Sequence, residues 1–210
     1  MRLVGQFDSP YVRRVAISMR ILDVPFDHVP WSIGSDQQRV AELNPLGQVP
    51  TLVLDDGEVI VDSATILDHL DQLAGSRALV PATGAARRHV LHLATIAMGL
   101  ADKARLIATE GIFRPASARH EPYVQRLRTQ MLGAGAFLER ACSERADHAW
   151  LCGEALSQAD ISLASAITYA KEAAGFPLDE HRALRDRHAR LEALPVFREI
   201  YTPFDAPVPT

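Results

Sequence analysis

Cysteine is scarce in this sequence, which contains only Cys142 and Cys152 among its 210 residues. The two do not form a CxxC pair, so neither a disulfide framework nor a thiolate metal site is indicated, and buried reduced thiols are the simplest interpretation. The spacing of His89 and His92 could place two imidazoles on one helix face, but no third ligand accompanies them. We therefore assign no metal site.

Excess positive charge and long apolar runs are also lacking. The formal net charge is −4 at pH 7 and no dense basic run occurs, which argues against a nucleic-acid partner. No stretch is long and apolar enough to span a membrane, and Met1-Arg2-Leu3 leads directly into a predicted strand instead of a signal peptide. We expect a cytoplasmic protein with neither a nucleic-acid nor a membrane partner.

The first part of the chain alternates short strands and helices. The predicted strands are residues 2–5, 27–29, 51–54 and 58–61, and the predicted helices are residues 10–22, 36–43 and a segment that starts at residue 63. This order is βαβ followed by ββα, which is the plan of a thioredoxin-like domain. In that plan the junction of the first strand with the first helix meets the loop before the third strand at one edge.

The second part of the chain shows helical periodicity and no convincing strand. We predict a thioredoxin-like domain at residues 1–76, a linker at 77–84 and an all-helical domain at 85–210. The long periodicities cover residues 85–109 and 123–146, with a flexible connection that contains Gly111. Ser157 and Asp160 form a capping box before a further helix, and we interpret this box as structural.

The loop from Asn44 to Pro50 is the most informative segment. A proline just before a strand is usually trans, in which case the loop simply ends where the strand begins. If the bond is cis, the chain reverses at Val49, and the N–H and C=O groups of Val49 face outward. An extended peptide could then pair with both groups as an added strand.

Asp62 and Ser63 stand at the start of a helical pattern. Unpaired N–H groups of a first helical turn, together with the Ser63 hydroxyl, form an anion site that suits a carboxylate. Taken alone, Ser63 is more often merely a helix cap. Asp62 could receive an ammonium group, or it could be a solvated acid that complements the helix dipole.

Ser9 precedes Pro10, which suits the first position of a helix and leaves Ser9 as its cap. No histidine lies near Ser9 in sequence to act as its base, so a hydrogen-bond donor is a better role for it than a nucleophile. Donation to a bound thiol would favour the thiolate. Arg13, one turn later, could help to hold that thiolate or could be a solvated helix residue. Asp8 would oppose the thiolate if it pointed inward, so we expect it to point away or to bind a cation.

Together these features resemble the cytosolic glutathione transferases, here a bacterial member with a Ser-type active site. The resemblance covers nearly the whole chain and depends on four motifs, which are Ser9-Pro10-Tyr11, the proline loop, Asp62-Ser63 and Ser157-x-x-Asp160. It implies glutathione as co-substrate and a cis bond before Pro50. It further implies that Val49 pairs with the cysteinyl backbone, that Asp62 and Ser63 hold the γ-glutamyl end, and that Gln48 lies near the glycyl end.

The resemblance implies a homodimeric transferase in which Ser9 steadies the glutathione thiolate for attack on a small hydrophobic electrophile. Tyr11 is the alternative donor, since other branches use a tyrosine near this strand end. Residues expected to line the electrophile pocket are Phe7, Tyr11, Ile33, Met98, Arg105, Ile112 and Phe113. A glutathione-dependent peroxidase, isomerase or dehalogenase would use the same thiol site. A non-catalytic binding or regulatory protein of the same fold is the alternative from another class.

Overall fold

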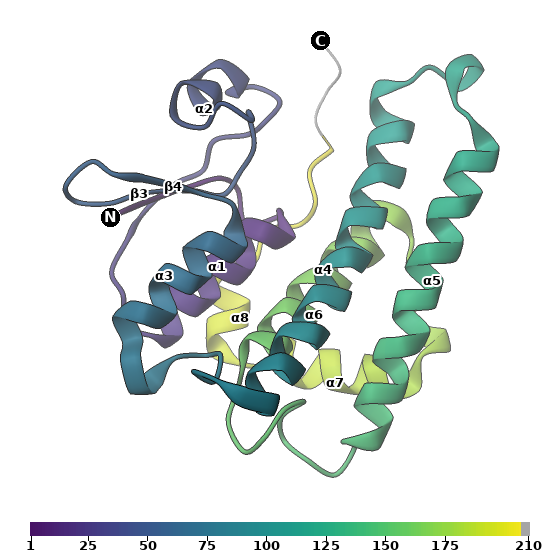
Figure 1. The fold of residues 1–210 in the computed structure, drawn as a ribbon. Coiled ribbons are helices and arrows are strands. Elements are labelled where there is room, and N and C mark those ends of the chain that lie inside the picture. Colours follow the sequence, from purple (N-terminus) through teal and green to yellow (C-terminus); the bar gives the residue numbers. More distant parts are fainter. Residues whose placement is uncertain (207–210) are drawn as a thin grey trace. The chain divides into compact units, whose positions relative to one another are not determined.

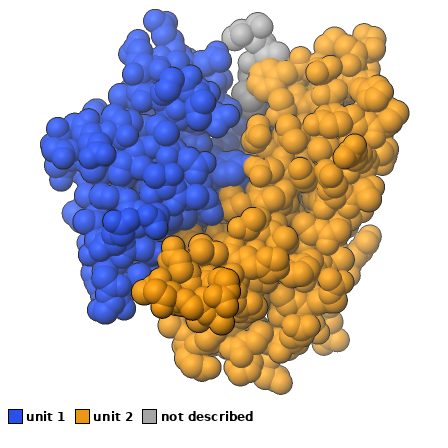
Figure 2. Space-filling view, viewed as in Figure 1, with its two compact units in different colours: residues 1–79, 195–208 blue, residues 80–194, 209–210 orange. Residues whose placement is uncertain are grey.

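The structure is a computed structural model that describes residues 1–206. The chain divides into two compact units (Figure 2). The first contains Met1–Leu79 and the segment that starts at Pro195, and the second contains Val80–Leu194. The predicted helical domain of residues 85–210 therefore differs in one respect, because the segment from Pro195 groups with the first unit. Its last four residues lie outside the described chain.

The first unit is built on a four-stranded sheet in the order β2-β1-β3-β4. The strands are β1 (Arg2–Val4), β2 (Asp27–Val29), β3 (Thr51–Val53) and β4 (Val59–Val61). β1 pairs parallel with β2 and antiparallel with β3, and β3 pairs antiparallel with β4. This arrangement confirms the predicted thioredoxin-like plan, since a parallel pair requires a crossover, here a helix, and an antiparallel pair allows a hairpin.

Helices of the first unit cover apolar strand residues. α1 (Pro10–Ile21) packs against both β1 and α3 (Ser63–Ala74), while α2 (Gln37–Leu43) precedes the proline loop (Figure 1). Leu3 of β1, Leu52 of β3 and Ile66 of α3 are fully buried. Burial of these side chains supplies the hydrophobic stabilisation that fixes the positions of the loops at the sheet ends.

A buried arginine anchors the C-terminal segment to α1. The Arg13 side chain is 2% exposed, and its guanidinium donates to the carbonyls of Ile200 at 2.7 Å and Phe197 at 2.9 Å. Phe197 belongs to α8 (Pro195–Glu199), which contacts α1. The interpretation of Arg13 as a solvated helix residue is therefore wrong, because its charge binds backbone carbonyls at the end of α8, and the interpretation that it helps to hold a thiolate stays a prediction.

The second unit consists of helices and connecting loops, and its described residues contain no strand. Its helices are α4 (Gly84–Phe113), α5 (Glu121–Glu144), α6 (Gln158–Ala174) and α7 (Arg182–Glu192), with short 3-10 turns at Ala116–Ala118 and Leu178–Glu180; a similar turn, Gly75–Arg77, ends the first unit. α4 packs against both α5 and α6, and α7 packs against α5 and α6. None of the helices in residues 1–206 has the length and apolar character that crossing a bilayer requires.

The end of α4 corrects one prediction. The sequence suggests a flexible segment at Gly111, Ile112 and Phe113, but these residues form the last turn of α4. The reason lies downstream, where the Arg119 guanidinium donates to the carbonyls of Gly111 at 2.6 Å and Arg114 at 3.1 Å. An arginine that bonds terminal helix carbonyls stabilises the last turn, and the local sequence periodicity contains no sign of it.

Candidate functional site

Three predicted site segments leave the sheet at the same end. Val4 of β1 pairs with Thr51 of β3, and Thr51 pairs with Val61 of β4. The chain continues from Val4 into the turn that carries Ser9, enters β3 from Val49 and Pro50, and continues from Val61 into Asp62. These segments are therefore neighbours because of the strand register, although they are far apart in sequence.

The proline loop is held by its first residue. Asn44 is 1% exposed, and its side chain donates to the Gln48 carbonyl at 2.8 Å and accepts from the Leu46 amide at 3.0 Å. The bond between Val49 and Pro50 is cis, as the resemblance implies. Within residues 1–206 the backbone N–H and C=O of Val49 form no hydrogen bond. Val49 is half-exposed, so an extended peptide has an unpaired backbone edge to bind.

The start of α3 differs from the expectation in one detail. The N-cap is Asp62 and not Ser63, because the Asp62 carboxylate accepts the Ala64 amide at 2.7 Å. Asp62 has a positive φ of 68°, which orients its side chain back over the first turn. The amides of Ser63 and Thr65 have no partner among the described residues. An exposed carboxylate therefore stands beside unpaired first-turn amides.

Arg14 is a site residue that the sequence analysis missed. Its guanidinium donates to the Ser63 hydroxyl oxygen at 2.6 Å, and both side chains are buried, at 8% and 1% exposure. Because that oxygen accepts from Arg14, the Ser63 proton remains available to a ligand. A positive charge beside an N-terminal turn also favours an anion. A charged residue beside the apolar face of α1 gives no sequence signal that distinguishes this contact from a solvated side chain.

Ser9 caps α1, as predicted. Its amide donates to the Gln6 carbonyl at 3.2 Å, and its hydroxyl oxygen accepts the Val12 amide at 3.5 Å. Pro10 occupies the first helical position. The Ser9 side chain is half-buried, and its hydroxyl proton can be donated outward because the oxygen acts as acceptor within the turn. Tyr11, the alternative donor, is also half-buried.

Asp8 is half-buried beside the C-terminal segment. Its carboxylate is 3.4 Å from the amide of Asp205, and burial raises the pKa of the Asp8 carboxyl, while backbone hydrogen bonds act in the opposite direction. The charge of Asp205 raises the pKa further. A carboxylate beside Ser9 would oppose a thiolate nearby, and a raised pKa acts in the direction of the uncharged carboxyl group.

The residues predicted to line the electrophile pocket belong to both units. Phe7 and Tyr11 are half-buried in the first unit, and Ile33 is 47% exposed there. The remaining four lie on α4 in the second unit: Met98, Arg105, Ile112 and Phe113. Of these, Met98 is buried and Phe113 is 52% exposed. The joint pocket stays a prediction.

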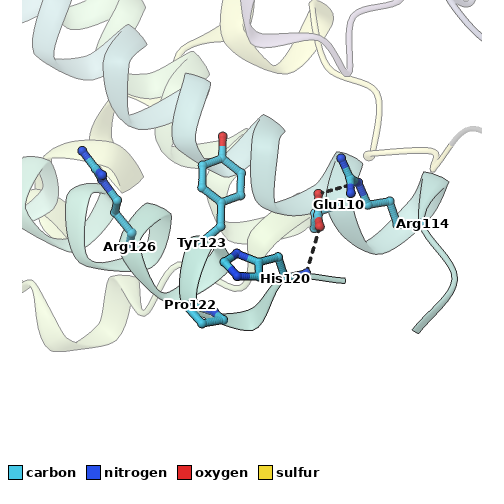
Figure 3. Close-up of a pocket in the computed structure, with 6 residues that line it drawn as sticks. All are labelled: Glu110, Arg114, His120, Pro122, Tyr123 and Arg126. Carbon is cyan, nitrogen blue, oxygen red and sulfur yellow. Dashed lines mark hydrogen bonds and ion pairs between the residues drawn. The ribbon is translucent and has the colours of Figure 1, made fainter. Parts of the chain in front are cut away.

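A separate pocket of about 360 Å³ lies in the second unit, between the end of α4 and the start of α5 (Figure 3). It is lined by Glu110, Arg114, His120, Pro122, Tyr123 and Arg126. The Glu110 carboxylate is bound by the Arg114 side chain at 3.1 Å and by the His120 amide at 3.2 Å. This buried carboxylate is therefore already paired with partners from the protein itself. None of the predicted electrophile residues lines the pocket.

Comparison with known proteins agrees with the fold and with the resemblance. The glutathione S-transferase N-terminal domain matches residues 3–78, and the glutathione S-transferase C-terminal domain matches residues 98–195. The uncharacterized GST-like protein YibF of Escherichia coli (strain K12) is 30% identical over 131 residues, which cover 62% of this chain and 64% of YibF. The alignment thus spans less than two thirds of that curated relative.

Solved structures align over nearly the full chain. A glutathione S-transferase from Methylobacterium radiotolerans, in complex with glutathione sulfonate, is 26% identical with a TM-score of 0.86 and covers 97% of each chain. A glutathione transferase family member from Pseudomonas fluorescens Pf-5, with bound glutathione, is 28% identical with a TM-score of 0.85, covering 97% of this chain and 99% of the other. The chain belongs to the glutathione S-transferase family.

Proposed function

We propose that this protein is a glutathione transferase that activates the glutathione thiolate for attack on a small hydrophobic electrophile. The observation that carries the proposal is the unpaired Val49 backbone, which lies at the sheet end that also bears the Ser9 turn and the start of α3. The glutathione-bound relatives of the same fold support it.

Glutathione is extended in this proposal. Its cysteinyl backbone pairs with Val49, and its γ-glutamyl carboxylate binds the Ser63 hydroxyl and the unpaired first-turn amides of α3. The γ-glutamyl ammonium pairs with the exposed carboxylate of Asp62. Gln48, which is exposed in the same loop, binds near the glycyl end. The γ-glutamyl carboxylate then faces hydrogen-bond donors, and the ammonium group faces a carboxylate.

Ser9 then donates a hydrogen bond from its hydroxyl group to the sulfur, and the N-terminus of α1 adds positive potential. Lowering a thiol pKa from about 8.5 to about 6.5 requires roughly 2.7 kcal/mol of differential stabilisation. One charge-assisted hydrogen bond contributes about 1.5–3 kcal/mol, which meets this requirement. The thiol proton leaves to solvent, the thiolate forms a carbon–sulfur bond, and the leaving group departs with its bonding electrons.

The electrophile in this proposal is held by the largely apolar set of residues predicted from the sequence. The active protein in this proposal is a cytoplasmic homodimer. Phe7 and Tyr11 adjoin Ser9 in sequence, and Met98, Arg105 and Ile112 follow one another at seven-residue spacing along α4. Such spacing puts side chains on one side of a helix. Light scattering on the purified protein tests the dimer.

Calorimetric titration with glutathione, followed by turnover with a chloronitrobenzene, tests the proposal. We expect Ser9→Ala to lower kcat by about tenfold to a hundredfold, with glutathione affinity nearly unchanged. Tyr11→Phe is the matched control, because it removes the other nearby hydroxyl. A greater loss in Tyr11→Phe would assign the donor role to Tyr11. Absence of glutathione binding would overturn the proposal, and binding without turnover on a panel of electrophiles would favour a binding module.

A further inference from the structure

His28 lies in β2 against the turn that carries Ser9. Its Nε2 atom is 2.8 Å from the Gly5 carbonyl oxygen, and its ring stacks on Phe7 with centroids 3.8 Å apart and an interplanar angle of 5°. A carbonyl oxygen can only accept, so Nε2 must carry the proton in this contact. One side chain thus binds the backbone at the start of the turn and covers an aromatic ring within it.

Gly5 is the point where this turn contacts the proline loop. Its φ is +127°, and a Cβ added there would lie 2.5 Å from Val12 Cγ2 and 2.8 Å from Val49 Cβ. Only glycine fits such a conformation and such close neighbours. Its amide donates to the Val29 carbonyl at 2.9 Å. Gly5 is therefore fixed by β2 through its own N–H and C=O groups while it touches α1 and the proline loop.

We propose that His28 is a positioning residue of the thiol site, which acts through Gly5 and Phe7 and does not touch the ligand. This inference rests on the proposed function, because it concerns how Ser9 is aligned with a thiol bound along Val49. The His28–Gly5 bond fixes the start of the turn, and the stacked Phe7 ring fixes its middle. Ser9 follows two residues after Phe7 and is tied back to Gln6 by its amide.

The effect of His28 should fall on thiolate formation more than on glutathione binding. Asp62 and Ser63 lie outside the turn that His28 holds, and Val49 adjoins that turn only at Gly5, so glutathione binding depends on it less than the position of Ser9 does. The hydrogen bond from Ser9 to sulfur depends on the position of a single hydroxyl group. Displacement of a catalytic group by about 1 Å can cost up to about a hundredfold in rate.

Two substitutions separate the two contacts of His28. His28→Phe keeps an aromatic ring against Phe7 and removes the donor to Gly5, whereas His28→Gln offers an amide donor and removes the stacking. We expect His28→Phe to lower kcat about tenfold and to shift the pH profile of turnover to higher pH, with KM for glutathione within about threefold. We expect His28→Gln to retain more of the rate than His28→Phe, because its side-chain amide can donate to the Gly5 carbonyl.

His92→Phe is the matched control, since His92 forms an edge-to-face pair with Phe137 in the second unit. Wild-type kinetics in both His28 variants, or an equal change in the control, would overturn the inference. An unshifted pH profile with a raised KM would also overturn it, because His28 would then support binding alone.

Hydrogen–deuterium exchange of the free protein tests the positioning network without glutathione. In His28→Phe we expect faster exchange in the segment from Gly5 to Ser9, and unchanged exchange in α5. Unchanged exchange in that segment would overturn the inference. If wild-type protein fails to bind glutathione while the segment exchanges faster in the variant, the proposed function fails and the network is supported. The two failures are thus distinguishable.

Discussion

Helices α3 and α6 both begin with a serine and an aspartate, yet the two starts differ in what remains available to a ligand. At α6 the Asp160 side chain has no exposed surface, and its carboxylate accepts the Leu151 amide at 2.8 Å, the Ser157 amide at 3.1 Å and the Ser157 hydroxyl at 2.9 Å. Burial raises the pKa of this carboxyl, and these hydrogen bonds oppose that rise. All of these donors come from the protein itself.

At α3 the aspartate is exposed and the serine is buried. One Asp62 oxygen caps the helix through the Ala64 amide, and the Ser63 hydroxyl receives a hydrogen bond from Arg14. The comparison teaches that the residue types of a helix start do not decide between a structural cap and a binding site. The neighbouring segments determine which it is. α3 follows β4 at the open end of the sheet, whereas residues 151–157 supply the hydrogen-bond donors that cover the start of α6.

The largest effect should come from Asp160→Ala. This change leaves the Leu151 and Ser157 amides without an acceptor in a buried environment, so we expect the free energy of unfolding to fall by about 3 kcal/mol. Urea denaturation measures the loss. Asp62→Ala, which removes an exposed cap, should cost no more than about 1 kcal/mol. Equal losses in the two variants would contradict the distinction between a closed and an open start.

The converse should hold for ligand binding. We expect Asp62→Ala to weaken glutathione binding by about tenfold to a hundredfold, because an ammonium group loses its counter-ion. Calorimetric titration measures the change. Asp56→Ala is the control, since Asp56 is an exposed acid in the turn between β3 and β4 whose carboxylate accepts the Glu58 amide. Similar affinities for both variants would remove Asp62 from the site.

The sequence predicts the backbone of the site better than its buried charges. The Ser9 cap follows from local residue preferences, whereas the cis bond before Pro50 and the role of Val49 follow from the family resemblance, and the strand order brings these segments to one sheet end. Arg13 and Arg14 escaped correct interpretation because helical periodicity identifies an apolar face but does not reveal which flanking charge meets a buried partner from a distant segment.

The cap of α3 and the contacts of His28 are not predicted from the sequence, for related reasons. Asp62 adopts a positive φ, which is uncommon for a residue other than glycine, so local residue preferences favour Ser63 as the cap. His28 lies in a short strand whose sequence contains no motif, and its contacts with Gly5 and Phe7 depend on the parallel pairing of β1 with β2. Such contacts require the tertiary structure.

A smaller effect is expected when Arg14, which binds Ser63 at the start of α3, is replaced. Arg14→Met removes the donor to Ser63, so we expect the free energy of unfolding to fall by about 1–2 kcal/mol and glutathione affinity by about threefold to tenfold. Arg20→Met is the control on the same helix, because Arg20 pairs with Glu199 at the surface, at 3.0 Å. Surface pairs contribute about 0–1 kcal/mol. Unchanged affinity in Arg14→Met would show that Ser63 does not depend on Arg14.

The smallest effect is expected near the start of α6, where Cys142 and Cys152 lie close enough to Asp160 for its charge to affect their pKa values. Burial, to which the negative charge of Asp160 adds, raises the pKa of Cys142 to about 12 and that of Cys152 to about 11. Since the thiolate is the reactive form, both should be labelled slowly by iodoacetamide in the folded protein near neutral pH. Cys152 is half-exposed and Cys142 is 1% exposed, so Cys152 should react at least about tenfold faster. Site-resolved mass spectrometry measures both rates, and full labelling in urea is the control. Rapid labelling of Cys142 in the folded protein would show that the region around Asp160 opens readily, and the contrast with α3 would then be one of degree.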